Sequence, residues 1–188
     1  MSTKRNKATI LENIKRILSK WGFSKKGLSR NTKGEWYLSA QLIIVILHLL
    51  PSCPKIEYII FPLNIIFMIA GIIISIQGLI ITMKAFIDLG NNLTPLPYPM
   101  KDSILIKSNS YKNSRHPLYK GLLFISLGIS IFSLSLLHLS LFICLSYILK
   151  IKAKKEEERL RIKFPEYKQY IKDVPAIINN IKYFDWRQ

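Results

Sequence analysis

The sequence predicts an all-α membrane protein with about four transmembrane helices, and three observations lead to this prediction. Of the 188 residues, 49% are hydrophobic, and they fall in long blocks. The 28 Lys and Arg residues, against 11 Asp and Glu, lie between and outside these blocks. The blocks divide into four segments, near 36–54, 58–83, 117–133 and 136–151. Apolar blocks separated by basic loops are typical of polytopic membrane proteins.

The net charge of +17 has a simple explanation in such a protein. Basic residues beside apolar segments are attracted to anionic lipid headgroups. The basic stretches contain no nucleic-acid-binding module, so we expect membrane lipids and no nucleic acid as partners. The two cysteines, Cys53 and Cys144, have neither disulfide nor metal-ligand spacing, and no metal site is expected.

The first two apolar segments differ in length. Segment 36–54 follows a basic N-terminal segment, 1–35, and is short for a hydrocarbon layer of about 30 Å. Segment 58–83 is long enough to span with some tilt. Small residues are spaced along one of its helical faces, at Gly71, Ser75, Gly78 and Thr82. Such a face allows a second helix to approach closely.

The apolar run at 118–151 is too long for one crossing. It has 34 residues, which as one helix would measure about 50 Å. Two helices joined by a turn near 133–140 fit the membrane better. Gly121, Gly128 and Ser135 recur every seven residues and predict another close-packing face.

The distribution of basic residues predicts the orientation. Ten Lys and Arg precede the first segment, five lie in 84–115 and eleven lie from Lys150 onward. One lies in the 51–57 connection and none in the 133–140 turn. Four crossings place all three basic regions on one side, which the positive-inside rule makes cytoplasmic. We therefore expect both termini, the 152–188 tail and the site described next to be cytoplasmic.

A polar motif stands at the start of the third segment: Arg115-His116-Pro117-Leu118-Tyr119-Lys120-Gly121. Proline suits the first turn of a helix, and a helix N-terminus favours anions. Arg115 offers a planar fork for a carboxylate, Tyr119 a ring and a hydroxyl, and Gly121 room for close approach. The alternative is that these are headgroup-facing, interfacial and packing residues.

An acidic run, Glu156-Glu157-Glu158, follows the fourth segment. It carries three of the chain's eleven acidic residues, and the helical hairpin would bring it to the same membrane face as Arg115 and His116. Cations and carboxylates that converge in this way could bind one small ligand of mixed charge. The alternative is a solvated amphipathic helix with Lys–Glu pairs four residues apart.

Three motifs in order resemble the isoprenylcysteine carboxyl methyltransferase and phospholipid methyltransferase group of integral membrane enzymes. They are Arg-His-Pro-Leu-Tyr-x-Gly at 115–121, Glu-Glu-x-x-Leu-x-x-x-Phe at 156–164 and Tyr-x-x-Tyr-x-x-x-Val-Pro at 167–175. Ahead of the first motif, the Gly-Pro-Tyr-Arg common in that group is reduced here to its tyrosine, Tyr111. The resemblance covers roughly residues 60–175 and implies a methyltransferase domain, which we assign to 36–188.

The resemblance also implies a cofactor, S-adenosylmethionine. Its expected contacts are Tyr111, Arg115, His116, Tyr119, Gly121, Glu156 and Glu157. Arg115 would hold the carboxylate of the cofactor, and Glu156 or Glu157 its ammonium or ribose. Which two of the three glutamates face it stays open, and no catalytic acid or base is assigned.

The acceptor implied by the resemblance is a lipid-like or isoprenoid molecule, such as a prenylated cysteine, a phospholipid amine or a quinone-like compound. Two alternatives remain. A membrane reductase of the sterol or steroid type would use a nicotinamide cofactor, but no Gly-rich dinucleotide loop is present. A non-enzymatic membrane protein is the other alternative. The sequence does not predict the oligomeric state.

Overall fold

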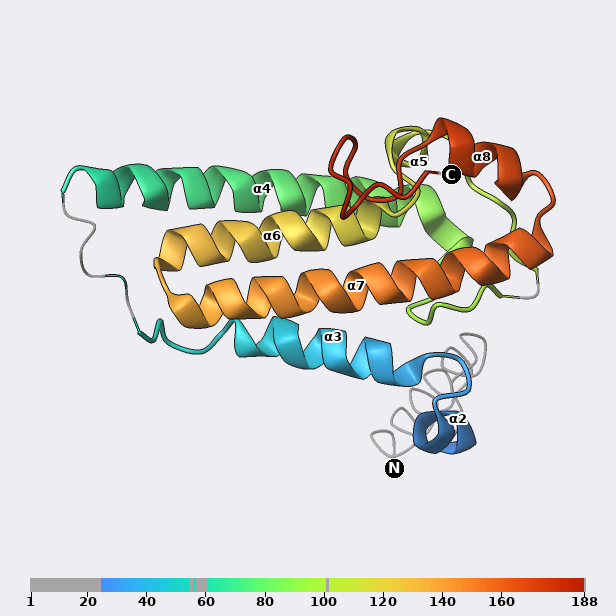
Figure 1. Cartoon of the computed structure of the whole chain (residues 1–188), viewed down its shortest axis with the longest axis horizontal. Coiled ribbons are helices and arrows are strands. Elements are labelled where there is room, and N and C mark those ends of the chain that lie inside the picture. The colour runs from blue at the N-terminus through green and yellow to red at the C-terminus, as the bar shows by residue number, and fades with distance from the viewer. Residues whose placement is uncertain (1–24, 55, 57–60, 101, 188) are drawn as a thin grey trace, which may run out of the picture.

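A computed structural model describes residues 25–54, 56, 61–100 and 102–187 (Figure 1). In this part of the chain the regular structure is helical and there is no β-strand, which confirms the all-α prediction. The helices are α2 (Lys25–Arg30), α3 (Glu35–Leu47), α4 (Leu63–Leu89), the 3-10 turn η1 (Gly90–Asn92), α5 (Ser110–Asn113), α6 (Pro117–Ser133), α7 (Leu136–Lys163) and α8 (Tyr167–Asp173).

Four helices run side by side along the long axis of the molecule (Figure 1). The α6 helix packs against α4 on one side and α7 on the other, and α3 packs against α7. The short helices α5 and α8 and the C-terminal segment gather at the end of the bundle where α6 begins.

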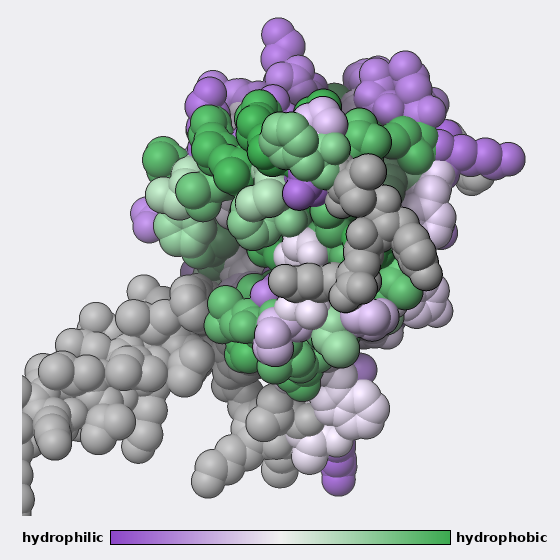
Figure 2. All heavy atoms as spheres, turned by 90° about the vertical axis from the view of Figure 1, so that its left-hand side faces the viewer, coloured by the Kyte–Doolittle hydropathy of each residue, from purple (hydrophilic) through white to green (hydrophobic). Residues whose placement is uncertain are grey.

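Within the described residues, two helices are long and apolar enough to cross a membrane: Leu63–Asn92 and Leu136–Lys163. The apolar α3 and α6 are shorter, with 13 and 17 residues. Large hydrophobic side chains stay exposed along α4, among them Ile66, Ile73 and Ile80. Figure 2, which views the end of the bundle where α4 begins, shows hydrophobic side chains gathered over the helices. Such a surface suits lipid contact; four crossings remain a prediction.

Glycines on the predicted close-packing faces bring α4 and α6 into close contact. A methyl group on Gly78 would lie 2.7 Å from the Gly121 carbonyl oxygen, and one on Gly71 would lie 2.6 Å from that of Gly128. The hydroxyls of Ser75 and Thr82 donate to carbonyls of their own helix, so this contact leaves neither polar group unsatisfied. The glycines of the two predicted small faces therefore pack against each other. The prediction is wrong for Ser135, which lies beyond the end of α6 at the start of α7 and hydrogen-bonds to the Cys53 backbone.

Three predicted boundaries of the first two apolar segments differ from the structure. The first helix ends at Leu47 rather than near 54, because Pro51 and Pro54 lack the N–H that would continue it. The second begins at Leu63, directly after Pro62, and continues to Leu89 instead of ending at 83. Residues 57–60, at the predicted start of that segment, and residues 1–24 of the N-terminal segment lie outside the described part.

The hairpin itself agrees with the sequence prediction. The α6 helix spans 117–133 as expected, and α7 begins at Leu136 after a two-residue turn. However, α7 does not end at 151 but continues to Lys163. The added residues are helix formers without glycine or proline, and Pro165 follows their end. The acidic run therefore lies on the same helix as the fourth apolar segment.

Candidate active site

The start of α6 is fixed by the C-terminal segment. Pro117 occupies the first turn of α6, as its missing N–H favours. The backbone N–H groups of Arg115 and His116 donate to the carbonyls of Pro175 and Ala176, both at 2.9 Å. Segments about sixty residues apart are thereby joined, and the Val174-Pro175 end of the third motif supports the first motif.

Arg115 and Glu157 form a buried ion pair beneath the site. Arg115 Nε donates to Glu157 Oε1 at 2.8 Å, and Nη2 donates to Oε2 at 3.3 Å. The remaining terminal nitrogen, Nη1, donates to the carbonyls of Ile171 at 2.9 Å and Val174 at 2.6 Å. The arginine side chain is fully buried. Its guanidinium is thus engaged by protein groups and ties α7 to α8.

Glu157 accepts from two further residues. His116 Nε2 and Trp186 Nε1 each lie 2.9 Å from one of its carboxylate oxygens. An ionised carboxylate only accepts hydrogen bonds, so the proton on this side of the imidazole is on Nε2. The other ring nitrogen of His116 faces Glu156, at 3.7 Å from Oε2.

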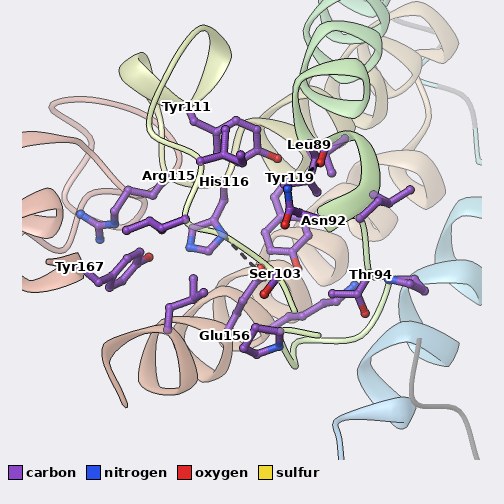
Figure 3. A pocket seen from close by; sticks show the side chains of 18 of the residues that line it. Leu89, Asn92, Thr94, Ser103, Tyr111, Arg115, His116, Tyr119, Glu156 and Tyr167 are labelled. Atoms are coloured by element: carbon purple, nitrogen blue, oxygen red, sulfur yellow. Dashed lines mark hydrogen bonds and ion pairs between the residues drawn. The ribbon is translucent and has the colours of Figure 1, made fainter. Parts of the chain in front are cut away.

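Glu156 is the glutamate that faces a cavity. It lies one residue before the buried Glu157 and its side chain is 27% exposed. The Tyr119 hydroxyl donates to Glu156 Oε2 at 2.8 Å. The Tyr119 ring stacks on His116, with ring centroids 5.3 Å apart and planes inclined by 4°. The aromatic pair and the carboxylate form one continuous wall (Figure 3).

Three further tyrosines surround this wall. Tyr111 lies on α5, and Tyr167 and Tyr170 lie on α8. The Tyr170 hydroxyl donates to the Tyr111 carbonyl. Burial raises the pKa of Tyr111, Tyr167 and Tyr170, so all three hydroxyls remain protonated donors. The buried Tyr167 hydroxyl has no hydrogen-bond partner among the described residues and points toward the cavity in Figure 3.

The cavity has a volume of about 230 Å³. The first turns of α6, the C-terminal half of α7, α8, the end of α4 and the 93–106 loop enclose it, and α3 closes one side. Much of its lining is apolar, including Leu89, Leu93, Ile104, Leu160 and Phe164. A mainly apolar cavity with a few convergent polar groups is the usual form of a small-molecule site.

The structure brings most of the expected site residues together. Tyr111, Arg115, His116, Tyr119 and Glu156 line the cavity. In Figure 3 the Arg115 side chain extends away from His116, Tyr119 and Glu156.

Two expected residues lie elsewhere. Glu157 is behind the cavity wall, bonded to Arg115. Gly121 lies in the α4–α6 contact, where a methyl group would be 2.1 Å from Thr82 Oγ1, and it does not line the cavity. Glu158 is exposed and also lies outside the cavity lining.

A sequence model of phospholipid methyltransferases matches residues 66–166. The matched region covers more than half of the chain and contains α4 from residue 66, α5, α6, α7 and both polar motifs. The chain belongs to the phospholipid methyltransferase family. A search of curated proteins finds no match.

Membership of the phospholipid methyltransferase family supports a membrane methyltransferase and confirms the resemblance seen in the sequence. Part of the cavity wall lies outside the matched residues: Leu38 and Gln41 on α3, and Tyr167 and Tyr170 on α8.

Three residues at or behind the cavity carry no motif signal in the sequence. Lys152 and Gln41 line the cavity and bond to each other, and Trp186 donates to the buried Glu157. Lys152 is one of many lysines in the chain, and only its position four residues before Glu156 on a helix could have indicated a shared face.

Proposed function

We propose that the protein transfers a methyl group from S-adenosylmethionine to a lipid-like acceptor at the cytoplasmic face of a membrane. One observation carries this proposal. In a chain of the phospholipid methyltransferase family, the start of α6 and the charged half of α7 enclose a cavity that presents Glu156, Tyr119 and His116.

The polar groups of the cavity suit this methyl donor. S-adenosylmethionine carries a carboxylate, an ammonium, a sulfonium and an adenosine. The carboxylate of Glu156 can accept from the ammonium or from ribose hydroxyls. The faces of Tyr119 and Tyr111 suit the sulfonium cation or the adenine ring. The unsatisfied hydroxyl of Tyr167 needs a polar partner, which a ligand in the cavity would supply.

Arg115 and Glu157 support the site from behind in this proposal. Both side chains are buried, and their hydrogen bonds go to each other and to neighbouring protein groups. They hold His116 in one orientation and hold α6, α7 and α8 in register. We therefore assign them to positioning the wall rather than to direct contact with the donor.

The bound donor supplies an electrophilic methyl group, and the residues must align it with the acceptor. Holding two reactants in line removes much of the entropic barrier. The apolar lining excludes water, which would otherwise compete for the polar groups of both ligands. An acceptor carboxylate would need no base, whereas an amine or hydroxyl must lose a proton.

The membrane side of the cavity suits a lipid-like acceptor. Leu38 of α3, Leu89 of α4 and Leu122 of α6 contribute to its wall, and each belongs to an apolar helix of the bundle. With α3, α4, α6 and α7 all crossing the membrane, the three basic regions would share the cytoplasmic side. The donor would then arrive from the cytoplasm and the acceptor from the bilayer.

The test is methyl transfer by purified protein in lipid nanodiscs with S-adenosylmethionine labelled in its methyl group. Phosphatidylethanolamine and farnesylcysteine are offered separately as acceptors, and label is followed into the lipid fraction. We expect Glu156→Gln to weaken donor binding, and the neighbouring exposed Glu158→Gln to leave it unchanged. If the wild-type protein binds labelled nicotinamide cofactor and not the methyl donor, the proposed function is wrong.

A further inference from the structure

Lys152 is a buried cation in the wall of the cavity. It lies on α7, is 2% exposed and lines the same cavity as Glu156. Lysine is rarely buried unless it is paired with an opposite charge. A buried ammonium without an anionic partner is unfavourable, so the surroundings of Lys152 indicate what it binds.

The residues that directly contact the Lys152 ammonium are neutral. Its Nζ donates to Gln41 Oε1 at 2.7 Å and lies 5.2 Å from the centroid of the Tyr119 ring. No carboxylate of the described residues lies within ion-pair distance of this ammonium, and Glu156 attracts it only over a longer distance. A lysine ammonium has three donors, and Gln41 uses one of them.

The other cations at the site are not available for an anion. The Arg115 guanidinium donates to Glu157 and to two backbone carbonyls. His116 faces the carboxylates of Glu156 and Glu157. Of the charged residues that line the cavity, Lys152 is therefore the one that retains donors for an anionic group of a ligand.

Lys152 and Glu156 together match a zwitterion. Residues four apart on a helix are neighbours on one face, with Cβ atoms about 5–6 Å apart. They present one positive and one negative charge to the same cavity. An α-amino acid group carries an ammonium and a carboxylate with a similarly small separation.

We infer that Lys152, held by Gln41, binds the carboxylate of the amino acid end of the methyl donor, while Glu156 binds its ammonium. This inference rests on the proposed function and replaces Arg115 as the carboxylate-binding residue. The paired charges of Lys152 and Glu156 require a ligand with a small zwitterionic group. With that group bound between them, the sulfonium and adenosine of the donor extend along the tyrosine-lined part of the cavity.

The experiment compares S-adenosylmethionine with decarboxylated S-adenosylmethionine, which lacks only the carboxylate. Equilibrium binding of both is measured on the full chain in nanodiscs. We expect the wild-type protein to prefer the carboxylate-bearing ligand by about tenfold or more, as for one charge-assisted hydrogen bond. Lys152→Met should abolish this preference, and Lys152→Arg should retain part of it.

A second variant and a control accompany this comparison. Gln41→Glu places a carboxylate on Lys152, so it should weaken binding of S-adenosylmethionine selectively without removing the lysine. Lys155→Met changes an exposed lysine on the same helix that does not line the cavity, and both affinities should stay at the wild-type values.

The outcomes separate this inference from the proposed function. If Lys152→Met weakens both ligands equally, retains the wild-type preference or raises only the KM of the acceptor, Lys152 does not bind the donor carboxylate and the inference is wrong. In each of these cases the wild-type protein still binds the methyl donor, so the proposed function stands. Failure of the wild-type protein to bind either ligand would overturn both.

Discussion

Replacing Glu157 by glutamine should destabilise the protein far more than the same change at its neighbour Glu156. Glu157 accepts two hydrogen bonds at each carboxylate oxygen: Arg115 Nε and His116 Nε2 at Oε1, and Arg115 Nη2 and Trp186 Nε1 at Oε2. Glutamine keeps one acceptor oxygen and turns an NH₂ group toward the other two donors. Whichever way the amide is turned, two hydrogen bonds are lost, and two N–H donors of the neighbouring residues then face the NH₂ group of the glutamine.

The magnitude follows from the burial of the pair. Breaking a buried ion pair by removing one charge typically costs about 3–5 kcal/mol, because the remaining charge is left uncompensated. For a chain of this length, each kcal/mol corresponds to about 2–4 °C in Tm, so a decrease of about 6–20 °C is expected. Glu156→Gln removes a partly exposed acceptor of one hydroxyl and should cost about 1 kcal/mol or less.

Thermal unfolding of both variants in nanodiscs, followed by tryptophan fluorescence, measures this difference. Trp186 contacts Glu157 and makes the emission sensitive to the site. Donor binding measured below the transition should be weaker in Glu156→Gln. Equal Tm values for the two variants would refute the assignment of Glu157 to the buried ion pair.

Three further changes test other parts of the fold. Gly78→Ala puts a methyl group 2.6 Å from the facing backbone and should cost about 1–3 kcal/mol in thermal unfolding, whereas Ile76→Ala on the exposed face should cost much less. Tyr167→Phe removes an unsatisfied buried hydroxyl, so Tm should not fall while donor binding weakens; a lower Tm with unchanged binding would contradict this. Trp186→Phe removes one hydrogen bond to the buried carboxylate and should cost about 1–3 kcal/mol, with faster proteolysis of the C-terminal segment as the measurement; wild-type proteolysis rates would argue against it.

The hairpin and the helix contacts could be predicted from the sequence because they depend on local signals. Pro117 marks the start of α6, and the length of the apolar run requires a turn before α7. The spacing of Gly71 and Gly78, and of Gly121 and Gly128, predicts that each helix is closely approached by another, and the structure shows that α4 and α6 approach each other. Each of these features follows from residue size or from one backbone constraint.

The partners within the site could not be predicted in the same way. The motif places Arg115 beside a helix N-terminus, where an anionic ligand is the expected partner. In the fold, α8 and the residue after it bring the backbone carbonyls of Ile171 and Val174 to the guanidinium of Arg115. Whether an arginine binds ligand or backbone depends on such tertiary contacts. The spacing of Lys152 and Glu156 indicates a shared helix face, but the contact of Lys152 with Gln41 could not be predicted because the two residues are more than a hundred positions apart.

The unbroken course of α7 constrains how its length can vary. Leu145 and Leu149 pack in the core, and Lys152 and Glu156 follow on the same helix without an interruption. One residue inserted between Leu149 and Lys152 would rotate the rest of the helix by about 100° relative to the core. The side chains of Lys152 and Glu156 would then point away from the cavity. Seven inserted residues, about two turns, would restore the angular phase. The apolar half and the charged half of α7 can therefore be moved apart only by insertions that complete nearly whole turns. Any adaptation of this helix to a thicker bilayer would follow the same steps.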